Sequence, residues 1–168
     1  MGQSLQSERG FTYLGILVLI AIIGISTYAT LKLGIIMQRR IAEERLLAVG
    51  AEFQHAFESY ANASAPGRPR APASLQDLLK DPRSPTLRRH LRKIYVDPIT
   101  GDDQWGIVPA IPGPGISGVY SMAIGTPIKL ANFEPRFENF EGQSSYQGWI
   151  FSLPSTLVMA TGQAMQKR

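Results

Sequence analysis

The fold of this chain is decided by the stretch ERGFTYLGILVLIAIIGISTYATL, which runs from Glu8 to Leu31. After Arg9 no charged residue occurs until Lys32. As a helix, an uncharged run of this length spans the roughly 30 Å hydrocarbon core of a bilayer. It is longer than the apolar region of a cleaved secretory signal, which has about 7–15 residues, and a helix of a soluble protein is seldom apolar on every face. The stretch therefore predicts a membrane helix.

The helix is predicted to continue beyond Lys32 as an amphipathic segment. Apolar residues recur every three to five positions, and most charged residues lie between them, which is typical of a helix with one apolar stripe. The stripe consists of Met37, Ile41, Leu46, Val49, Phe53, Phe57 and Tyr60. No proline occurs from Met1 to Ala65, so we expect one continuous helix from Phe11 to about Asn62.

The residues around the start of the apolar run resemble the class III signal of type IV prepilins and of type II secretion pseudopilins. Polar residues end at Glu8-Arg9, Gly10 follows, and the apolar run begins at once with Phe11. In that family a prepilin peptidase cuts after the glycine, on the cytoplasmic side, and methylates the new N-terminal amine. The resemblance implies cleavage between Gly10 and Phe11 and N-methylation of Phe11.

Gly15 departs from the family pattern. Most members carry glutamate as the fifth mature residue, where its carboxylate is thought to pair with the N-terminal amine of a neighbouring subunit during assembly. In this chain that position is Gly15, and some minor pseudopilins at the filament tip also lack the glutamate. The resemblance therefore implies a minor or atypical subunit, and it leaves the docking contact open.

A loop and a basic cluster follow the helix. Residues 63–74 contain three prolines and a glycine and are predicted to form a loop. Ser74 is expected to cap a short helix at Leu75–Lys80, and a second short helix is expected at Leu87–Lys93. The basic cluster consists of Arg88, Arg89, Arg92 and Lys93. Such a cluster is either a solvated or subunit-contacting face or a contact for an anionic partner.

A second motif, YVDPITGDDQWG, runs from Tyr95 to Gly106. Aspartate bonds to backbone ahead of it, proline fixes φ, glycine adopts positive φ, and tryptophan can anchor the turn. The residues in these roles, with the closing glycine, are Asp97, Pro98, Gly101, Trp105 and Gly106. The motif resembles the segment of type II secretion pseudopilins that combines DP, G and WG, where it joins the helical part to the sheet.

The remainder of the chain is predicted to form a small antiparallel sheet. Three β-prone runs occupy Trp105–Ile111, Gly118–Ile124 and Tyr146–Leu153, and residues 129–145 are predicted to be irregular. Packed on the apolar stripe, the sheet would bury Val49, Phe53, Phe57, Trp105, Tyr120 and Trp149.

The predicted fold class is α+β, with the pilin-like lollipop architecture of a long N-terminal helix packed on a small antiparallel β-sheet. The expected divisions are a leader peptide at 1–10, a transmembrane helix at 11–36, its amphipathic extension at 37–63, and an extracytoplasmic globular region at 64–168, made of a variable loop with short helices at 64–104 and the sheet at 105–168.

No catalytic chemistry is predicted. The chain has no cysteine, which excludes disulfides and thiolate nucleophiles. His55 and His90 are far apart in the sequence, and no hydrolase, phosphate-loop or zinc-protease motif occurs. Asp97, Asp102 and Asp103 offer oxygen ligands of the kind that calcium takes, but no EF-hand spacing is present. We expect turn-forming aspartates, neither metal nor cofactor, and no enzyme activity.

The resemblance implies a pseudopilin subunit of a type II secretion system or of a related type IV pilus-like machine. It would be a single-pass protein of the bacterial inner membrane, with a cytoplasmic N-terminus and a periplasmic C-terminal domain, and would assemble into a short filament. The implied partners are other pseudopilins, prepilin peptidase, an inner-membrane assembly platform and membrane lipid. A net charge of +4 is small for a nucleic-acid binder, and none is expected. Two alternatives stay open: a minor pilin that binds DNA or a surface through its basic cluster, and a membrane protein that does not polymerise.

Overall fold

The structure is a computed structural model that describes residues 8–65, 67–111 and 113–153, with the backbone alone in 8–12 and 26–33. The fold class is α+β, as predicted. Two compact units divide the chain, and the second begins at Arg40. The elements are α1 (Glu8–Asn62), α2 (Gln76–Leu79), β1 (Gly106–Pro109), β2 (Ile116–Tyr120), the 3-10 helices η1 (Pro135–Phe140) and η2 (Tyr146–Gly148), and β3 (Phe151–Ser152).

Helix α1 has 55 residues and ends at Asn62, where the sequence predicts its end. Its last turn closes with the Ala63 N–H donating to the Ser59 carbonyl at 3.1 Å. Pro66 follows in the sequence, and a proline disfavours helical geometry in the residue before it. The absence of proline up to that point explains the length of the helix.

The first unit presents large apolar side chains to solvent. From Tyr13 to Ile25 the exposed fractions of these side chains lie between 46% and 71%. Across the part of the chain that the structure describes, no helix combines the length and the apolar character that a membrane crossing requires.

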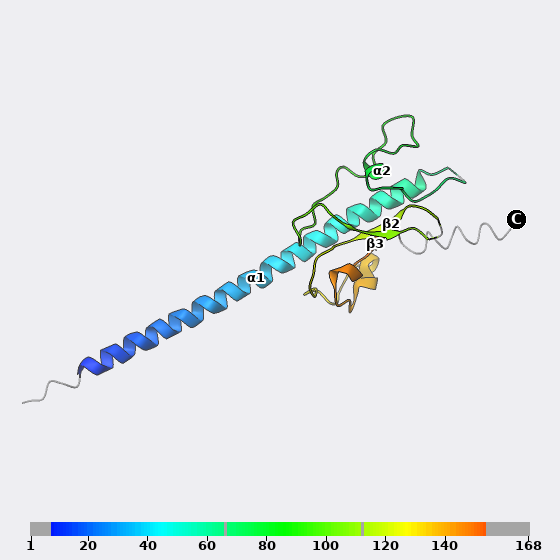
Figure 1. The fold of residues 1–168 in the computed structure, drawn as a ribbon. Coiled ribbons are helices and arrows are strands. Elements are labelled where there is room, and N and C mark those ends of the chain that lie inside the picture. The colour runs from blue at the N-terminus through cyan, green and yellow to red at the C-terminus, as the bar shows by residue number, and fades with distance from the viewer. Residues whose placement is uncertain (1–7, 66, 112, 154–168) are drawn as a thin grey trace, which may run out of the picture. The chain divides into compact units, whose positions relative to one another are not determined.

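The sheet of the second unit is antiparallel, with strand order β1-β2-β3; Figure 1 labels its strands β2 and β3. Gly106 pairs with Tyr120 and Val119 pairs with Phe151, and the β1–β2 register shifts between Val108 and Pro109. β1 and β2 begin and end within a few residues of their predicted positions. β3 is much shorter than predicted, because η2 occupies the first residues of the expected run at Tyr146–Leu153.

The core of the second unit lies between α1, the sheet and the two 3-10 helices. The ring of Phe151 lies against Gly50, where an added Cβ would come within 2.1 Å of it. Phe53 meets Trp105 with ring centroids 5.0 Å apart. Of the predicted core, four residues are buried and two, Val49 and Tyr120, are half-buried. The largest core side chains are Leu46, Phe53, Phe57, Trp105, Tyr146, Trp149 and Phe151.

The prediction of a helix at Leu87–Lys93 is wrong. That segment has no helical structure, because its backbone is bonded to the preceding segment instead. The N–H groups of His90 and Leu91 both donate to the Leu78 carbonyl, at 2.8 and 2.9 Å, and the Arg88 carbonyl accepts from Asp81 N–H at 3.0 Å. These long-range bonds use groups that a helix would need for itself.

Two smaller predictions also need correction. The short helix predicted at Leu75–Lys80 is present as α2, but Ser74 does not cap it. The Asp77 carboxylate instead accepts from the backbone N–H groups of Ala73 and Ser74 and from the Ser74 hydroxyl, at 2.9–3.3 Å. Residues 129–145 are not wholly irregular, because they contain η1.

Candidate functional site

The residues of the expected processing site lie at the start of α1. Gly10 and Phe11 fall within the helical backbone that begins at Glu8. Gly15 lies one turn further on, and an added Cβ there would meet nothing within 4 Å. The structure therefore brings the expected cleavage site and the atypical fifth position onto neighbouring turns of one helix.

The turn motif is organised by Asp97, which is fully buried. Its carboxylate accepts from Ile99 N–H at 2.9 Å and from the Ser121 hydroxyl at 2.5 Å. Its own carbonyl accepts from Gly101 N–H at 2.8 Å, and Gly101 has φ +76°, which favours glycine. Ser121 follows β2, so the bond from Asp97 ties the turn to the end of that strand.

Trp105 and Gly106 close the same motif, and Pro98 is half-buried beside Asp97. The Trp105 Nε1–H donates to the Tyr95 carbonyl at 2.8 Å. An added Cβ at Gly106 would come within 2.2 Å of the Tyr120 ring, so glycine is required for that ring to lie across β1.

A buried ionic cluster, missed by the sequence analysis, closes the end of α1. Asp81 is 4% exposed and accepts from the Arg83 guanidinium through both oxygens at 2.9 Å. These hydrogen bonds from Arg83 are the main reason why the pKa of Asp81 lies far below its ordinary value. Arg83 also donates to the Tyr60 carbonyl at 3.1 Å and lies 3.5 Å above the Tyr60 ring. A cation therefore meets the negative end of the helix.

His90 connects this cluster to α1. Its Nδ1 lies 2.8 Å from the Ser59 hydroxyl and its Nε2 lies 3.3 Å from an Asp81 oxygen. A serine, histidine and aspartate in a row also occur in acyl-transfer enzymes. Here Ser59 lies in the last turn of α1, where the free backbone groups are carbonyl oxygens, and these do not stabilise an oxyanion. The observed contacts instead attach the loop after α1 to the helix.

The four residues of the basic cluster are all exposed. Lys93 lies 5.5 Å from the Tyr95 ring centroid, and no ion pair is found for Arg88, Arg89 or Arg92 within the described ranges. The neighbouring acids are otherwise engaged, since Asp77 accepts from the Ala73 and Ser74 N–H groups just before α2 and Asp81 binds Arg83. The cluster is therefore an exposed positive surface whose three arginines have no ion-pair partner among the described residues.

Glu43 is a second buried acid that the sequence analysis did not single out. It is 2% exposed. One oxygen accepts from Ile128 N–H and from the Tyr146 hydroxyl, both at 2.6 Å, and the other accepts from Lys129 N–H at 3.0 Å. A charged residue three positions before Leu46, on the apolar stripe, was the available signal for a buried anchor.

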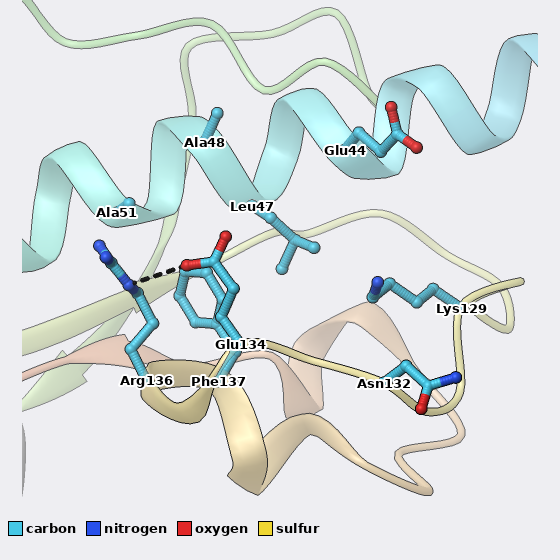
Figure 2. A pocket seen from close by; sticks show the side chains of 9 residues that line it. All are labelled: Glu44, Leu47, Ala48, Ala51, Lys129, Asn132, Glu134, Arg136 and Phe137. Carbon is cyan, nitrogen blue, oxygen red and sulfur yellow. Dashed lines mark ion pairs between the residues drawn. The ribbon is translucent and has the colours of Figure 1, made fainter.

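A groove of about 390 Å³ runs beside α1 in the second unit (Figure 2). Helix α1 forms one side, and the segment from Lys129 to Phe137 forms the other. The apolar lining consists of Leu47, Ala48, Ala51 and the buried Phe137, and the polar lining of Glu44, Lys129, Asn132, Glu134 and Arg136. Glu134 and Arg136 pair with each other at 3.2 Å.

No group of three or more potential metal ligands occurs within the residues that the structure describes. Asp97 is committed to the turn, and the Asp102 carboxylate accepts from Asp103 N–H at 2.7 Å. Comparison of the chain with protein-family models, with curated proteins and with solved structures finds no match.

Proposed function

We propose that this chain is a pseudopilin-type subunit, cut by a prepilin peptidase between Gly10 and Phe11 and assembled into a short filament. Its α1 helix would be held in the inner membrane before assembly and surrounded by neighbouring subunits afterwards. The domain that begins near Arg40 would then lie in the periplasm. The partners of such a subunit would be other pseudopilins, the peptidase and an assembly platform.

One observation carries the proposal: large apolar side chains from Tyr13 to Ile25 are exposed on a single helix. A large exposed apolar surface on an isolated chain indicates a site that contacts lipid or a protein partner. The uncharged sequence continues to Leu31, which is long enough for a bilayer. The Gly10-Phe11 junction stands directly before it, as in the prepilin signal.

The lollipop architecture is part of the same proposal. In this architecture the first half of one helix contacts lipid and the second half packs against a folded domain. Support comes from the packing of the second unit, where Phe53 and Phe57 of α1 are fully buried. The same helix thus continues from an exposed apolar segment into a domain core, which suits a subunit that moves from membrane to filament.

The test is the mass and N-terminus of the full chain purified from bacterial membranes with and without a prepilin peptidase. We expect a chain that starts at N-methylated Phe11 only when the peptidase is present. Gly10→Val should block the cut, because it removes the flexible glycine. Gly15→Ala is the matched control on the same helix and should be cut normally, since its Cβ enters open space.

Retention of Met1 in cells that contain the active peptidase would overturn the proposal and favour a membrane protein that does not polymerise. A correctly cut chain that never forms filaments with its assembly machinery would also contradict it.

A further inference from the structure

The segment Leu87–Arg89 is exposed but firmly held. Leu87 is 65% exposed, although it is a large apolar residue. Backbone bonds on both sides fix the segment, through Arg88 to Asp81 and through His90 to Leu78. A preorganised segment binds with a smaller loss of conformational entropy than a flexible one. Its apolar side chain followed by two cations is a pattern that a partner can recognise.

The groove beside α1 has the complementary chemistry. Its accessible apolar surface comes from Ala48, which is exposed, and from the half-buried Leu47 and Ala51, whereas Phe137 is only 3% exposed. Glu44 lies at its edge, and none of the ion pairs among the described residues involves it. Of the two cations at this groove, Arg136 pairs with Glu134 at 3.2 Å, and Lys129 lies 5.2 Å from the Phe133 ring centroid.

The two surfaces lie on different flanks of α1 and cannot meet within one copy. The Tyr60 ring meets His90, next to the basic segment, with centroids 5.3 Å apart, whereas Leu47 lines the groove. Helical geometry puts Leu47 and Tyr60 roughly 140° apart around the axis and about 20 Å apart along it. A contact between the two surfaces therefore requires a second copy.

We propose that Leu87–Arg89 of one copy docks in the groove of the next, with Leu87 on its apolar surface and Arg88 or Arg89 against Glu44. The inference rests on the proposed function and names the contact between its subunits. Because two different surfaces meet, a docked pair still has one free groove, on the first copy, and one free basic segment, on the second. Such a heterologous contact does not close as a two-fold dimer, and it propagates into an open filament when the rotation between copies does not close a ring.

The test is disulfide crosslinking between introduced cysteines, which have no native cysteine to compete with because the chain contains none. Two differently tagged full-length copies are produced together in cells that carry the peptidase and assembly machinery, one with Leu87→Cys and the other with Ala48→Cys. After mild oxidation of the membranes, we expect a disulfide-linked dimer that carries both tags. The matched control replaces Leu87→Cys by Asp103→Cys, which is also exposed, and should give no such dimer.

A second arm tests the charges in the same cysteine background. Glu44→Arg, and the paired change Arg88→Glu with Arg89→Glu, should each lower the crosslinked fraction roughly two- to fivefold, as expected for an exposed ion pair. The two changes together should restore it.

Three outcomes overturn the inference. One is normal filaments without the Leu87–Ala48 crosslink, which leaves the proposed function intact. Another is equal crosslinking of the Asp103 control. The third is absence of the crosslink together with salt-sensitive DNA binding that is lost when Arg88 and Arg89 are neutralised, which assigns the segment to nucleic acid. An unprocessed chain without filaments defeats the proposed function itself, and the inference falls with it.

Discussion

The carboxylate of Glu43 accepts a hydrogen bond of 2.6 Å from the hydroxyl of Tyr146, which lies 103 positions later in the sequence. The Tyr146 side chain is fully buried, and Glu43 also receives two backbone N–H groups from Ile128 and Lys129. One carboxylate therefore fastens both η2 and the loop before η1 to the first helical turn of the second unit.

Glu43→Gln should destabilise the second unit. The neutral amide offers one acceptor oxygen where the carboxylate offers two, so at least one buried donor loses its partner, at a cost of about 2 kcal/mol. Tyr146→Phe should cost less, about 1 kcal/mol. Glu44→Gln is the exposed control and should change little. Denaturant unfolding of the full chain in detergent, followed by tryptophan fluorescence, measures all three; equal stability of the Glu43→Gln and Glu44→Gln variants would contradict the anchor.

Arg83→Met should destabilise the end of α1, because it leaves Asp81 buried without its cation. The expected loss is about 3 kcal/mol, typical of a broken buried pair. Arg89→Met is the control on the exposed basic cluster and should stay within about 0.5 kcal/mol of the parent. The same unfolding measurement applies, and a small effect at Arg83 would show that the pair is not structural.

Acid should weaken the same cluster. The pKa of Asp81 is lower in the folded chain than its ordinary value of 3.8, chiefly through hydrogen bonds from Arg83. The pair thus contributes its full stability above about pH 4 and loses it as the pH falls further, when the unfolded chain binds a proton that the folded chain resists. Unfolding at pH 6 and pH 3 should show a smaller loss for Asp81→Asn than for the parent. An equal loss would contradict this account.

Gly50→Ala should be tolerated poorly. Its Cβ would lie 2.1 Å from the Phe151 ring, and that ring is buried among other aromatic side chains. Overpacking of this kind costs typically about 1–3 kcal/mol. Gly34→Ala, in the same helix with open space around it, is the matched control and should not destabilise. Thermal unfolding compares the two, and a stable Gly50→Ala variant would mean that α1 and β3 can separate.

Asp97→Ala should loosen the turn that precedes β1. The change leaves the Ile99 N–H and the buried Ser121 hydroxyl without their acceptor, which costs about 2 kcal/mol or more. Asp103→Ala changes an exposed residue of the same turn and should stay within about 0.5 kcal/mol. Hydrogen exchange at Ile99 and Gly101 reports the local effect, and unchanged protection there would be evidence against it.

The sequence predicts those parts of the fold that depend on local pattern. The proline-free run up to Ala65 predicts the end of α1, and the three β-prone runs predict a small antiparallel sheet. Turn chemistry at Asp97 and Gly101 is equally local, because each residue acts on backbone within a few positions.

The parts that the sequence misses depend on partners distant in the chain. Leu87–Lys93 contains good helix formers, yet the Leu78 carbonyl takes two of its N–H groups, and propensity carries no information about that. The burial of Asp81 likewise depends on Tyr60 and His90, which only the folded chain brings together. The groove beside α1 is formed by segments more than seventy residues apart, so no sequence window contains it.

The attachments of the second unit to α1 are spread along the helix, from Glu43 through Gly50 to Tyr60. These positions cover about 25 Å of helix length. A pull along the axis of this part of α1 would therefore load these attachments together, in shear. The domain would follow its helix under axial traction while remaining folded.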